Sequence, residues 1–354
     1  MVVKVSKPEI NVREKISELD KPSGTAGQAM LAAETPQEQQ ALVGVGRRNL
    51  LINGNMEVNQ RGYAGSYTST GFQYTVDRWA LGKNDAVNFT WEVDTFSDGF
   101  TGVPNGRGLI QYGLNSAGSG TDFVRLEQRI ENVKTAAGQH VTLSFWARSA
   151  TGSAFTLNHT AVPAAGALGL MQYFGTGGSP SGIVYAPFAS SITLSTEWTK
   201  YTYTTFVPDL SGKTIGTSGA DHLRLYVCNM DNDDVGKTIQ ITQLQLEIGK
   251  VATPFEHRSY GEELALCQRY YQYVERARGS GNRDAGQNTC AFSHRIPEMR
   301  ASPTMTRVVA GSPYNWNFTQ FANVNKSHVA VLIEIITTDA YWYYNDGYTA
   351  DAEL

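Results

Sequence analysis

Two kinds of residue in this sequence could do chemistry: paired carboxylates and aromatic rings. Glu127 and Glu131 are candidates for a glycosidase pair, which needs two carboxylates that face one bound sugar. Both share the polar side of their segment with Arg125 and Arg129. Surface charge pairing therefore explains the two glutamates better than catalysis does.

Other catalytic and metal patterns are missing from the sequence. There is no Gly-x-Ser-x-Gly turn for a nucleophilic serine, and the six histidines lack metal-ligand spacing. A structural hydrogen bond is the favoured interpretation of His257. Asp231, Asp233 and Asp234 lack the glutamate that ends a calcium-binding loop, which favours a solvated turn. We expect neither enzymatic activity nor a bound metal.

Aromatic residues on the polar sides of predicted strands are stronger candidates for binding. Trp146 lies opposite the apolar side of VTLSFWARS, and Arg224 and Tyr226 do the same in HLRLYVCNM. An exposed ring can stack on a sugar while arginine hydrogen-bonds to its hydroxyls. The same residue types are enriched in subunit interfaces. Both interpretations remain open, and the interface is favoured.

The C-terminal segment AYWYYNDGYTADAEL offers a second aromatic group. Its candidate glycan-binding residues are Tyr341, Trp342, Tyr343, Tyr344 and Tyr348. Rigid rings beside Asn and Gly suit a binding loop, because they give contact area at small entropic cost. They could equally fill the core of a small sheet or a trimer interface. Asn345-Asp346-Gly347 predicts a turn between the aromatic segments.

Strands must position these residues. Between Asp122 and Ser149, apolar residues alternate with polar ones in two runs separated by a break at Gly138. The apolar members are Val124, Leu126, Ile130, Val141, Leu143, Phe145 and Ala147. This pattern predicts two one-sided strands of an antiparallel sheet, covered by a second layer.

Strand signals separated by Gly, Asn, Asp and Ser continue to about Arg258, and they predict a mostly β fold with an antiparallel jelly-roll sandwich. Ala164–Gly182, rich in Gly and Ala, is predicted as a long loop. In TIQITQLQLEIG, the apolar residues change sides midway, which predicts either a β-bulge or a passage from one sheet face to the other. The residues concerned are Ile239, Ile241, Leu244 and Leu246.

The chain divides into three predicted parts. Residues 1–48 form a short helical N-terminal arm, residues 49–259 the jelly roll and residues 260–354 a small C-terminal β domain. The last part opens with a helical turn, and HVAVLIEIITT is its central strand. Proper helix caps favour an arm that folds against a partner over a flexible leader. Its apolar contact residues are Ile10, Ile16, Leu19, Met30, Leu31 and Leu42.

Composition excludes several partners. The formal net charge of -4 and the absence of a dense Lys/Arg cluster argue against nucleic acid. No apolar run approaches the about 20 residues of a membrane helix, and the first residues lack a signal core. Cys228, Cys267 and Cys290 show no Cys-x-x-Cys spacing and are predicted to be free thiols made in a reducing cytoplasm.

Three segments together resemble bacteriophage tail-fibre or receptor-binding virion proteins of the marine or cyanobacterial type. The segment from Ile10 to Gly62 resembles their N-terminal attachment segment. LEQRIENV, VTLSFWARS, WTKYTYTTFVP and QLQLEIGKVATPFEHRS are similar to a jelly-roll domain of the carbohydrate-binding-module type. EELALCQRYYQ resembles the start of their C-terminal segment. The resemblance covers the last 60 or so residues weakly.

The resemblance implies a non-enzymatic homotrimer in the virion tail, synthesised in the host cytoplasm. The arm would bind a phage tail or adaptor protein. Residues 260–354 would be the tip that contacts host surface polysaccharide or lipopolysaccharide. The alternative is a purely structural virion component, such as a tail adaptor or capsid decoration protein. A secreted lyase or hydrolase subunit is a third class, disfavoured by the missing signal peptide and carboxylate pair.

The sequence departs from related jelly rolls in one respect. They often hold a structural calcium between a carboxylate near the first strand and an acidic residue in the last. Glu57 could supply the first, but Thr242 and Gln243 stand where an aspartate is expected. Carboxylate-poor sites bind calcium only weakly, so we expect no cofactor.

Overall fold

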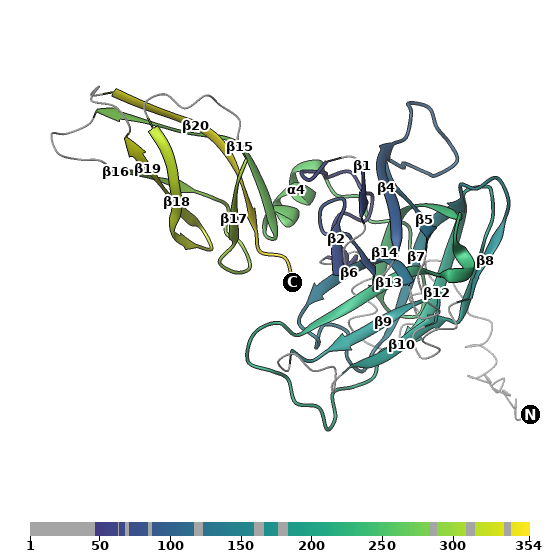
Figure 1. Ribbon diagram of the computed structural model, residues 1–354. Helices are drawn as coiled ribbons and strands as arrows, with labels where there is room; N and C mark the ends of the chain where they lie inside the picture. The colour runs from purple at the N-terminus through teal and green to yellow at the C-terminus, as the bar shows by residue number, and fades with distance from the viewer. Residues whose placement is uncertain are drawn as a thin grey trace, which may run out of the picture.

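The computed structural model describes residues 47–62, 64–67, 71–83, 87–116, 123–158, 166–175, 183–282, 289–308, 316–335 and 341–354. They form a large β-sandwich and a smaller β domain, with one helix between them (Figure 1). The predicted arm, including Ile10, Ile16, Leu19, Met30, Leu31 and Leu42, lies outside the described residues. Of the helices that the structure describes, none combines the length and the apolar character of a membrane span.

The sandwich consists of two six-stranded sheets and a small hairpin. Sheet A has the order β1 (Ala64–Tyr67), β4 (Asn88–Thr95), β5 (Gly108–Ser116), β14 (Thr238–Ile248), β7 (His140–Ser149), β12 (Thr199–Phe206). Sheet B has the order β10 (Val184–Ala189), β9 (Leu168–Tyr173), β13 (His222–Asp231), β6 (Phe123–Glu131), β3 (Ala80–Lys83), β2 (Gly71–Tyr74). The hairpin pairs β8 (Phe155–Asn158) with β11 (Ser191–Leu194), and a short 3-10 helix, η1, covers Asn232–Asp234.

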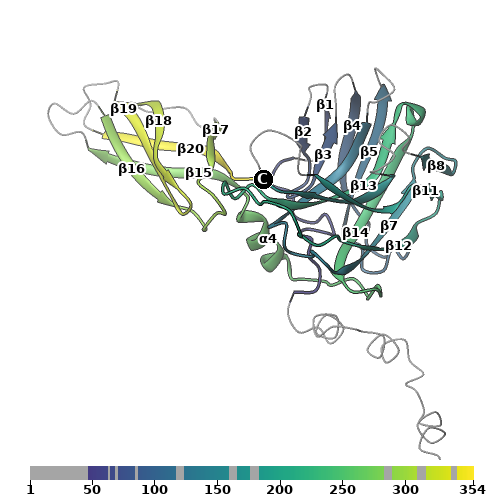
Figure 2. The same cartoon turned by 90° about the horizontal axis from the view of Figure 1, so that it is seen from below.

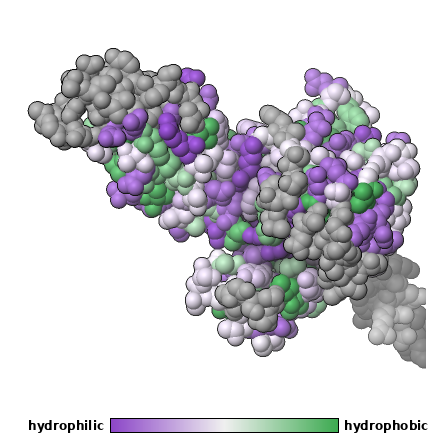
Figure 3. Space-filling view, in the orientation of Figure 1, coloured by the Kyte–Doolittle hydropathy of each residue, from purple (hydrophilic) through white to green (hydrophobic). Residues whose placement is uncertain are grey.

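Figure 2 shows the strands of the sandwich on one side of α4 and those of the C-terminal domain on the other. The strand pairs that the structure describes are antiparallel, so the predicted mostly β, antiparallel fold is confirmed. On the face seen in Figure 3, apolar residues occupy only small separate areas of the sandwich. Large apolar side chains such as Trp79, Phe89 and Phe145 are buried between the sheets.

The core between the sheets contains the apolar residues predicted from Asp122–Ser149. Six of them are fully buried, and Ile130 packs against the core from its edge. The expected pairing of the two strands is wrong, because β6 belongs to sheet B and β7 to sheet A. The strands face each other across the core. Alternation identifies the buried side of a strand but not the sheet that contains it.

The predicted loop at Ala164–Gly182 contains a strand. β9 pairs with both β10 and β13, and its Leu168 and Leu170 are fully buried in the core. The small residues of this segment serve close packing. A Cβ on Gly169 would collide with the Tyr226 ring on the paired strand, so the glycine leaves room for that ring.

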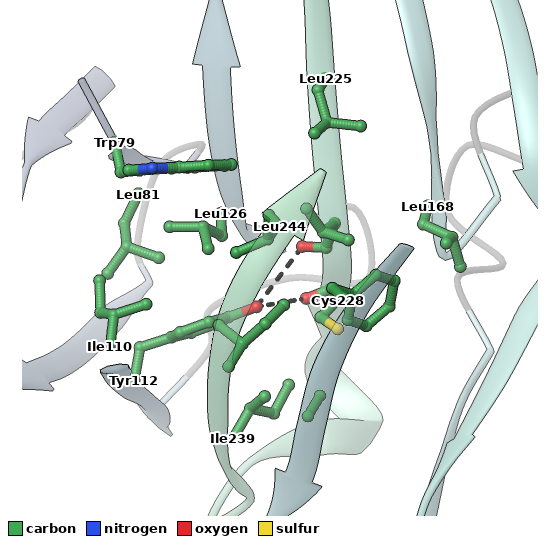
Figure 4. Close-up of a cluster of buried hydrophobic side chains, with 14 of the residues drawn as sticks. Trp79, Leu81, Ile110, Tyr112, Leu126, Leu168, Leu225, Cys228, Ile239 and Leu244 are labelled. Carbon is green, nitrogen blue, oxygen red and sulfur yellow. Dashed lines mark hydrogen bonds between the residues drawn. The ribbon is translucent and has the colours of Figure 1, made fainter. Parts of the chain in front are cut away.

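Tyr112 crosses the core and hydrogen-bonds to an irregular part of sheet B (Figure 4). Its hydroxyl donates to the carbonyl oxygens of Cys228 at 3.0 Å and Val227 at 3.4 Å. The pairing of β13 with β6 shifts register here, and Cys228 has φ +50°. The bulge removes these carbonyls from the ladder, and Tyr112 gives them a donor. The three cysteines are free thiols, as predicted.

The C-terminal domain begins with helix α4 (Tyr260–Gln268), whose Ser259 and Glu262 form a capping box. Two three-stranded sheets follow. One contains β15 (Tyr271–Asn282), β20 (Tyr341–Asp351) and β17 (Thr304–Val308), the other β16 (Thr289–Arg295), β19 (His328–Ile335) and β18 (Trp316–Asn325). As predicted, a helix opens this part and β19 is a central strand.

The turn predicted at Asn345-Asp346-Gly347 is wrong, because β20 continues through it. The Asp346 side chain is fully buried and forms an ion pair with Arg307 at 2.5 Å. The partner strand β15 bulges between Val274 and Ala277. A Cβ on Gly347 would lie 2.6 Å from the Glu275 carbonyl oxygen, so the glycine accommodates a bulge.

Buried charges and a small apolar cluster join the two domains. The Glu353 carboxylate forms ion pairs with Arg61 and Arg78 of the sandwich. The Arg61 guanidinium also stacks on the Tyr271 ring at 3.6 Å. The apolar cluster contains Ile52, Val58, Cys267 and Tyr270. The start and the end of the C-terminal domain are therefore both fixed to the sandwich.

We expect Tyr112→Phe to lower the free energy of unfolding of the sandwich by about 1–2 kcal/mol, since it leaves buried carbonyls without a donor. Calorimetric or chemical denaturation measures the loss. Tyr203→Phe is the control, because the Tyr203 hydroxyl makes no hydrogen bond within the described part of the chain. Equal stability of both variants would contradict the role given to Tyr112.

Candidate functional site

The outer side of sheet B was predicted to expose Tyr226 beside Arg224. The prediction is wrong for Tyr226, which is 0% exposed. Its ring packs with Met171, and Ile183 and Tyr185 pack against this pair. The alternation of β13 correctly directs Tyr226 away from the core, but side chains from neighbouring strands cover it. Such neighbours cannot be read from one strand.

A buried charge cluster occupies the same side of sheet B. Glu127 is 2% exposed, accepts a 2.5 Å hydrogen bond from Arg125 Nε and lies 3.5 Å from Arg224 Nη1. Burial alone would raise the pKa of Glu127, but Arg125 and Arg224 outweigh it and hold the pKa below its ordinary value. Glu127 thus pairs with Arg125 as predicted, although not at the surface. This cluster is packed rather than open to a ligand.

Glu131 has a different partner from the one expected. It accepts a hydrogen bond from Arg269 Nη2 at 2.9 Å and lies 3.8 Å from Arg300 Nε, both in the C-terminal domain. Glu127 and Glu131 therefore have separate structural partners. The two carboxylates therefore do not face a common open site.

The outer side of sheet A is open beside Trp146. This ring is partly exposed and lines a depression of about 490 Å³. The other lining residues come from the turn before β5, from β7, β12 and β14, and from the segment after β14: Pro104, Asn105, Ser144, Lys200, Gln243, Ala252, Thr253, Pro254, Phe255 and His257. We call this feature the Trp146 depression.

The predicted bulge in β14 is confirmed and shapes the floor of the Trp146 depression. The pairing of β14 with β7 shifts between Thr242 and Gln245, and Gln243 has φ +50°. The Gln243 Nε2 donates to the Pro104 carbonyl oxygen at 2.6 Å. The bulge directs the Gln243 side chain toward the turn before β5 and so holds this turn to the sheet beside Trp146. Bulges near binding sites commonly change the direction of a side chain in this way.

The Trp146 depression combines rings with neutral and cationic polar groups. His257 packs edge-on against Phe255, with ring centroids 5.0 Å apart. Desolvation of its ring and the nearby Arg107 lower the pKa of His257, so the imidazole is neutral at pH 7. No carboxylate is among the residues that line the depression. The arrangement can stack and hydrogen-bond a polar ring but offers no acid–base pair.

The residues considered for calcium have other partners. Glu57 accepts a hydrogen bond from Arg107 Nη1 at 2.9 Å, and the Thr242 hydroxyl donates to the Gly108 carbonyl oxygen at 2.5 Å. Within the residues that the structure describes, no group of three or more His, Cys, Asp or Glu could hold a metal ion.

The C-terminal aromatic residues fall into two groups. Tyr348 is fully buried in the core of the C-terminal domain, and its hydroxyl hydrogen-bonds to His294. It therefore matches the core-filling alternative and cannot bind a glycan. Tyr341, Trp342, Tyr343 and Tyr344 belong to β20, but their side chains lie outside the described residues.

Sequence reasoning named Trp146 as a candidate but not Asn105, Lys200 and Phe255, which line the same depression. Lys200 had a usable signal, because it lies on the polar parity of WTKYTYTTF. Asn105 and Phe255 lie outside strands, and only the folded chain brings them to Trp146.

No family model and no curated protein matches the sequence. The structure is similar to a Stig cyclase from Fischerella sp. TAU, at 13% identity over 58% of this chain and 100% of that chain, with TM-score 0.34. It is also similar to a xylan-binding domain from Paenibacillus barcinonensis, at 10% identity over 59% of this chain and 100% of that chain, with TM-score 0.32.

A third similar structure is the enzymatically active domain of bacteriophage CBA120 tailspike protein 4. The identity is 16% over 57% of this chain and 21% of that chain, with TM-score 0.30. The three similar proteins include enzyme domains and a binding module. Similarities at this level assign neither a family nor a ligand to this chain.

Glu127→Gln should destabilise the sandwich by about 3 kcal/mol at neutral pH, because it leaves Arg125 and Arg224 uncompensated. The lowered pKa means that the ionised carboxylate stabilises the fold above pH 4.5 and loses this effect as the pH falls through the folded-state value. Wild type and variant should therefore converge in acid. Denaturation at several pH values measures this, with the exposed Glu92→Gln as control. A pH-independent difference would contradict the ion-pair explanation.

Proposed function

We propose that this protein is a non-enzymatic phage tail fibre that adheres to the host surface by binding glycans at the Trp146 depression. The observation that supports it is the partly exposed Trp146 ring within a depression lined by polar groups. An aromatic platform with nearby hydrogen-bonding side chains suits the alternating apolar and polar faces of a sugar. The sandwich would be a jelly roll of the carbohydrate-binding type.

The chemistry of the Trp146 depression favours binding over hydrolysis. A glycosidase needs two carboxylates across the scissile bond, and none lines the depression. Lys200 and Asn105 can donate hydrogen bonds to sugar hydroxyls, and Lys200 adds a positive charge that suits acidic polysaccharide or lipopolysaccharide. Several copies on one virion would convert weak contacts into firm adhesion.

The attachment role rests on the sequence resemblance of the segment from Ile10 to Gly62. Residues 1–48 would bind a tail or adaptor protein, and the chain would assemble as a homotrimer in the virion tail. In this arrangement the sandwich and the C-terminal domain project toward the host. A structural virion component is the alternative, in which Trp146 is buried by a neighbouring subunit.

We expect Trp146→Ala to weaken glycan binding at least tenfold, because stacking contact is lost from an otherwise intact surface. Affinity electrophoresis with mixed-linkage β-glucan, xylan, alginate, dextran and bacterial lipopolysaccharide measures it. Phe206→Ala is the matched control, since Phe206 is 48% exposed on β12 but does not line the depression. Both variants should keep the wild-type melting temperature. Unchanged binding of Trp146→Ala, or a change in subunit number, would favour the structural alternative.

Deletion of residues 1–46 should leave a folded protein that retains glycan binding but is not incorporated into particles. Circular dichroism and the binding assay establish the fold and the activity of the remainder, and immunoblotting of purified virions measures incorporation. A truncated protein that still enters particles would refute attachment through this segment.

A further inference from the structure

A row of polar side chains crosses four strands on the outer side of sheet A. Glu92, Gln111, Gln240 and Arg148 occupy directly paired positions on β4, β5, β14 and β7. The Gln240 amide accepts from Arg148 Nε at 2.7 Å and donates to Gln111 Oε1 at 2.8 Å. Each amide is thereby held in one orientation. We call these four residues the amide row.

Each end of the amide row meets a feature that suits a ligand. Glu92, Gln111 and Gly113 are among the residues that line a second depression, of about 540 Å³. At the other end, the Arg148 guanidinium lies 5.4 Å from the centre of the Trp198 ring. Trp198 is partly exposed and contacts Phe96 edge-on at 5.4 Å. The amide row therefore extends from the depression beside Glu92 to the Trp198 ring.

The amide row keeps unused hydrogen-bonding capacity. Glu92 is exposed, and Gln111, Gln240 and Arg148 are partly exposed. Within the described part of the chain, the Gln111 Nε2 and the two terminal nitrogens of Arg148 have no hydrogen-bond partner. Oriented donors that need no rearrangement bind at low entropic cost. The hydrogen bonds within the amide row therefore hold these nitrogens of Gln111 and Arg148 in place to donate to a ligand.

We infer that the amide row binds an extended polysaccharide chain that lies across the strands of sheet A. Neighbouring strands are about 4.8 Å apart, which is close to the length of one sugar residue in an extended polysaccharide. Successive sugars can therefore meet successive side chains, with hydroxyls accepting from Gln111 and Arg148 and donating to Glu92. This inference rests on the proposed function and adds that the ligand is a long chain.

The test compares chain lengths and two kinds of variant. Mixed-linkage β-glucan, xylan, alginate and dextran are supplied as polymers, disaccharides and hexasaccharides, and affinities are measured by calorimetry. Gln240→Leu removes both bonds of the row at nearly constant volume, and Gln111→Leu is a second variant at the edge of the row. Gln320→Leu, at an exposed position on β18, is the matched control.

We expect wild type to bind at least one hexasaccharide ten or more times more tightly than its disaccharide. Gln240→Leu and Gln111→Leu should remove this gain, whereas Trp146→Ala should weaken both lengths. Equal affinity of wild type for both lengths, or wild-type affinity in both leucine variants, would overturn the inference and leave the proposed function standing. Absence of binding to all probes would count against both. A change in subunit number in the leucine variants would make this side an interface and also overturn the inference.

Discussion

The bulge in β14 is the constraint on which the open side of the sandwich depends. This strand lies between β5 and β7, and its apolar residues change parity at Gln243. Because the bulge adds a residue, Ile241 before it and Leu244 after it are both fully buried. The same change leaves Gln240 on the outer side before the bulge and brings Gln243 to the Trp146 depression at the bulge. Core packing and surface chemistry are thus set by one backbone irregularity.

The opposite side of the sandwich is closed by charge pairing. Glu127 is buried between Arg125 and Arg224, and Arg78 pairs with Glu353 of the C-terminal domain. Buried ion pairs give little net stability, because desolvation offsets their attraction, but they penalise any arrangement that separates them. The pair between Arg78 and Glu353 therefore favours one docked position of the C-terminal domain. On sheet A, in contrast, Trp146 and Gln111 line depressions whose linings include exposed polar residues.

The sequence contained enough to predict which residues face the core, because alternation is a local property of a strand. It predicted the β14 bulge for the same reason, and it directed Trp146 away from the core. It did not predict that β6 and β7 lie in different sheets, that β9 exists or that Tyr226 is covered. These properties depend on strands distant in sequence. The turn predicted at Asn345-Asp346-Gly347 is wrong because Gly347 makes room for a bulge in the neighbouring strand β15.

The arrangement of the outer side of sheet A bears on the kind of glycan that the proposed function would require. A terminal sugar is usually bound in an enclosed pocket that covers most of its surface, whereas the Trp146 depression and the amide row both lie on the outer side of one sheet. Under the proposed function, such an extended surface would gain affinity from repeated contacts along a chain, and several copies on one particle would multiply that gain. Each contact can then be weak and reversible.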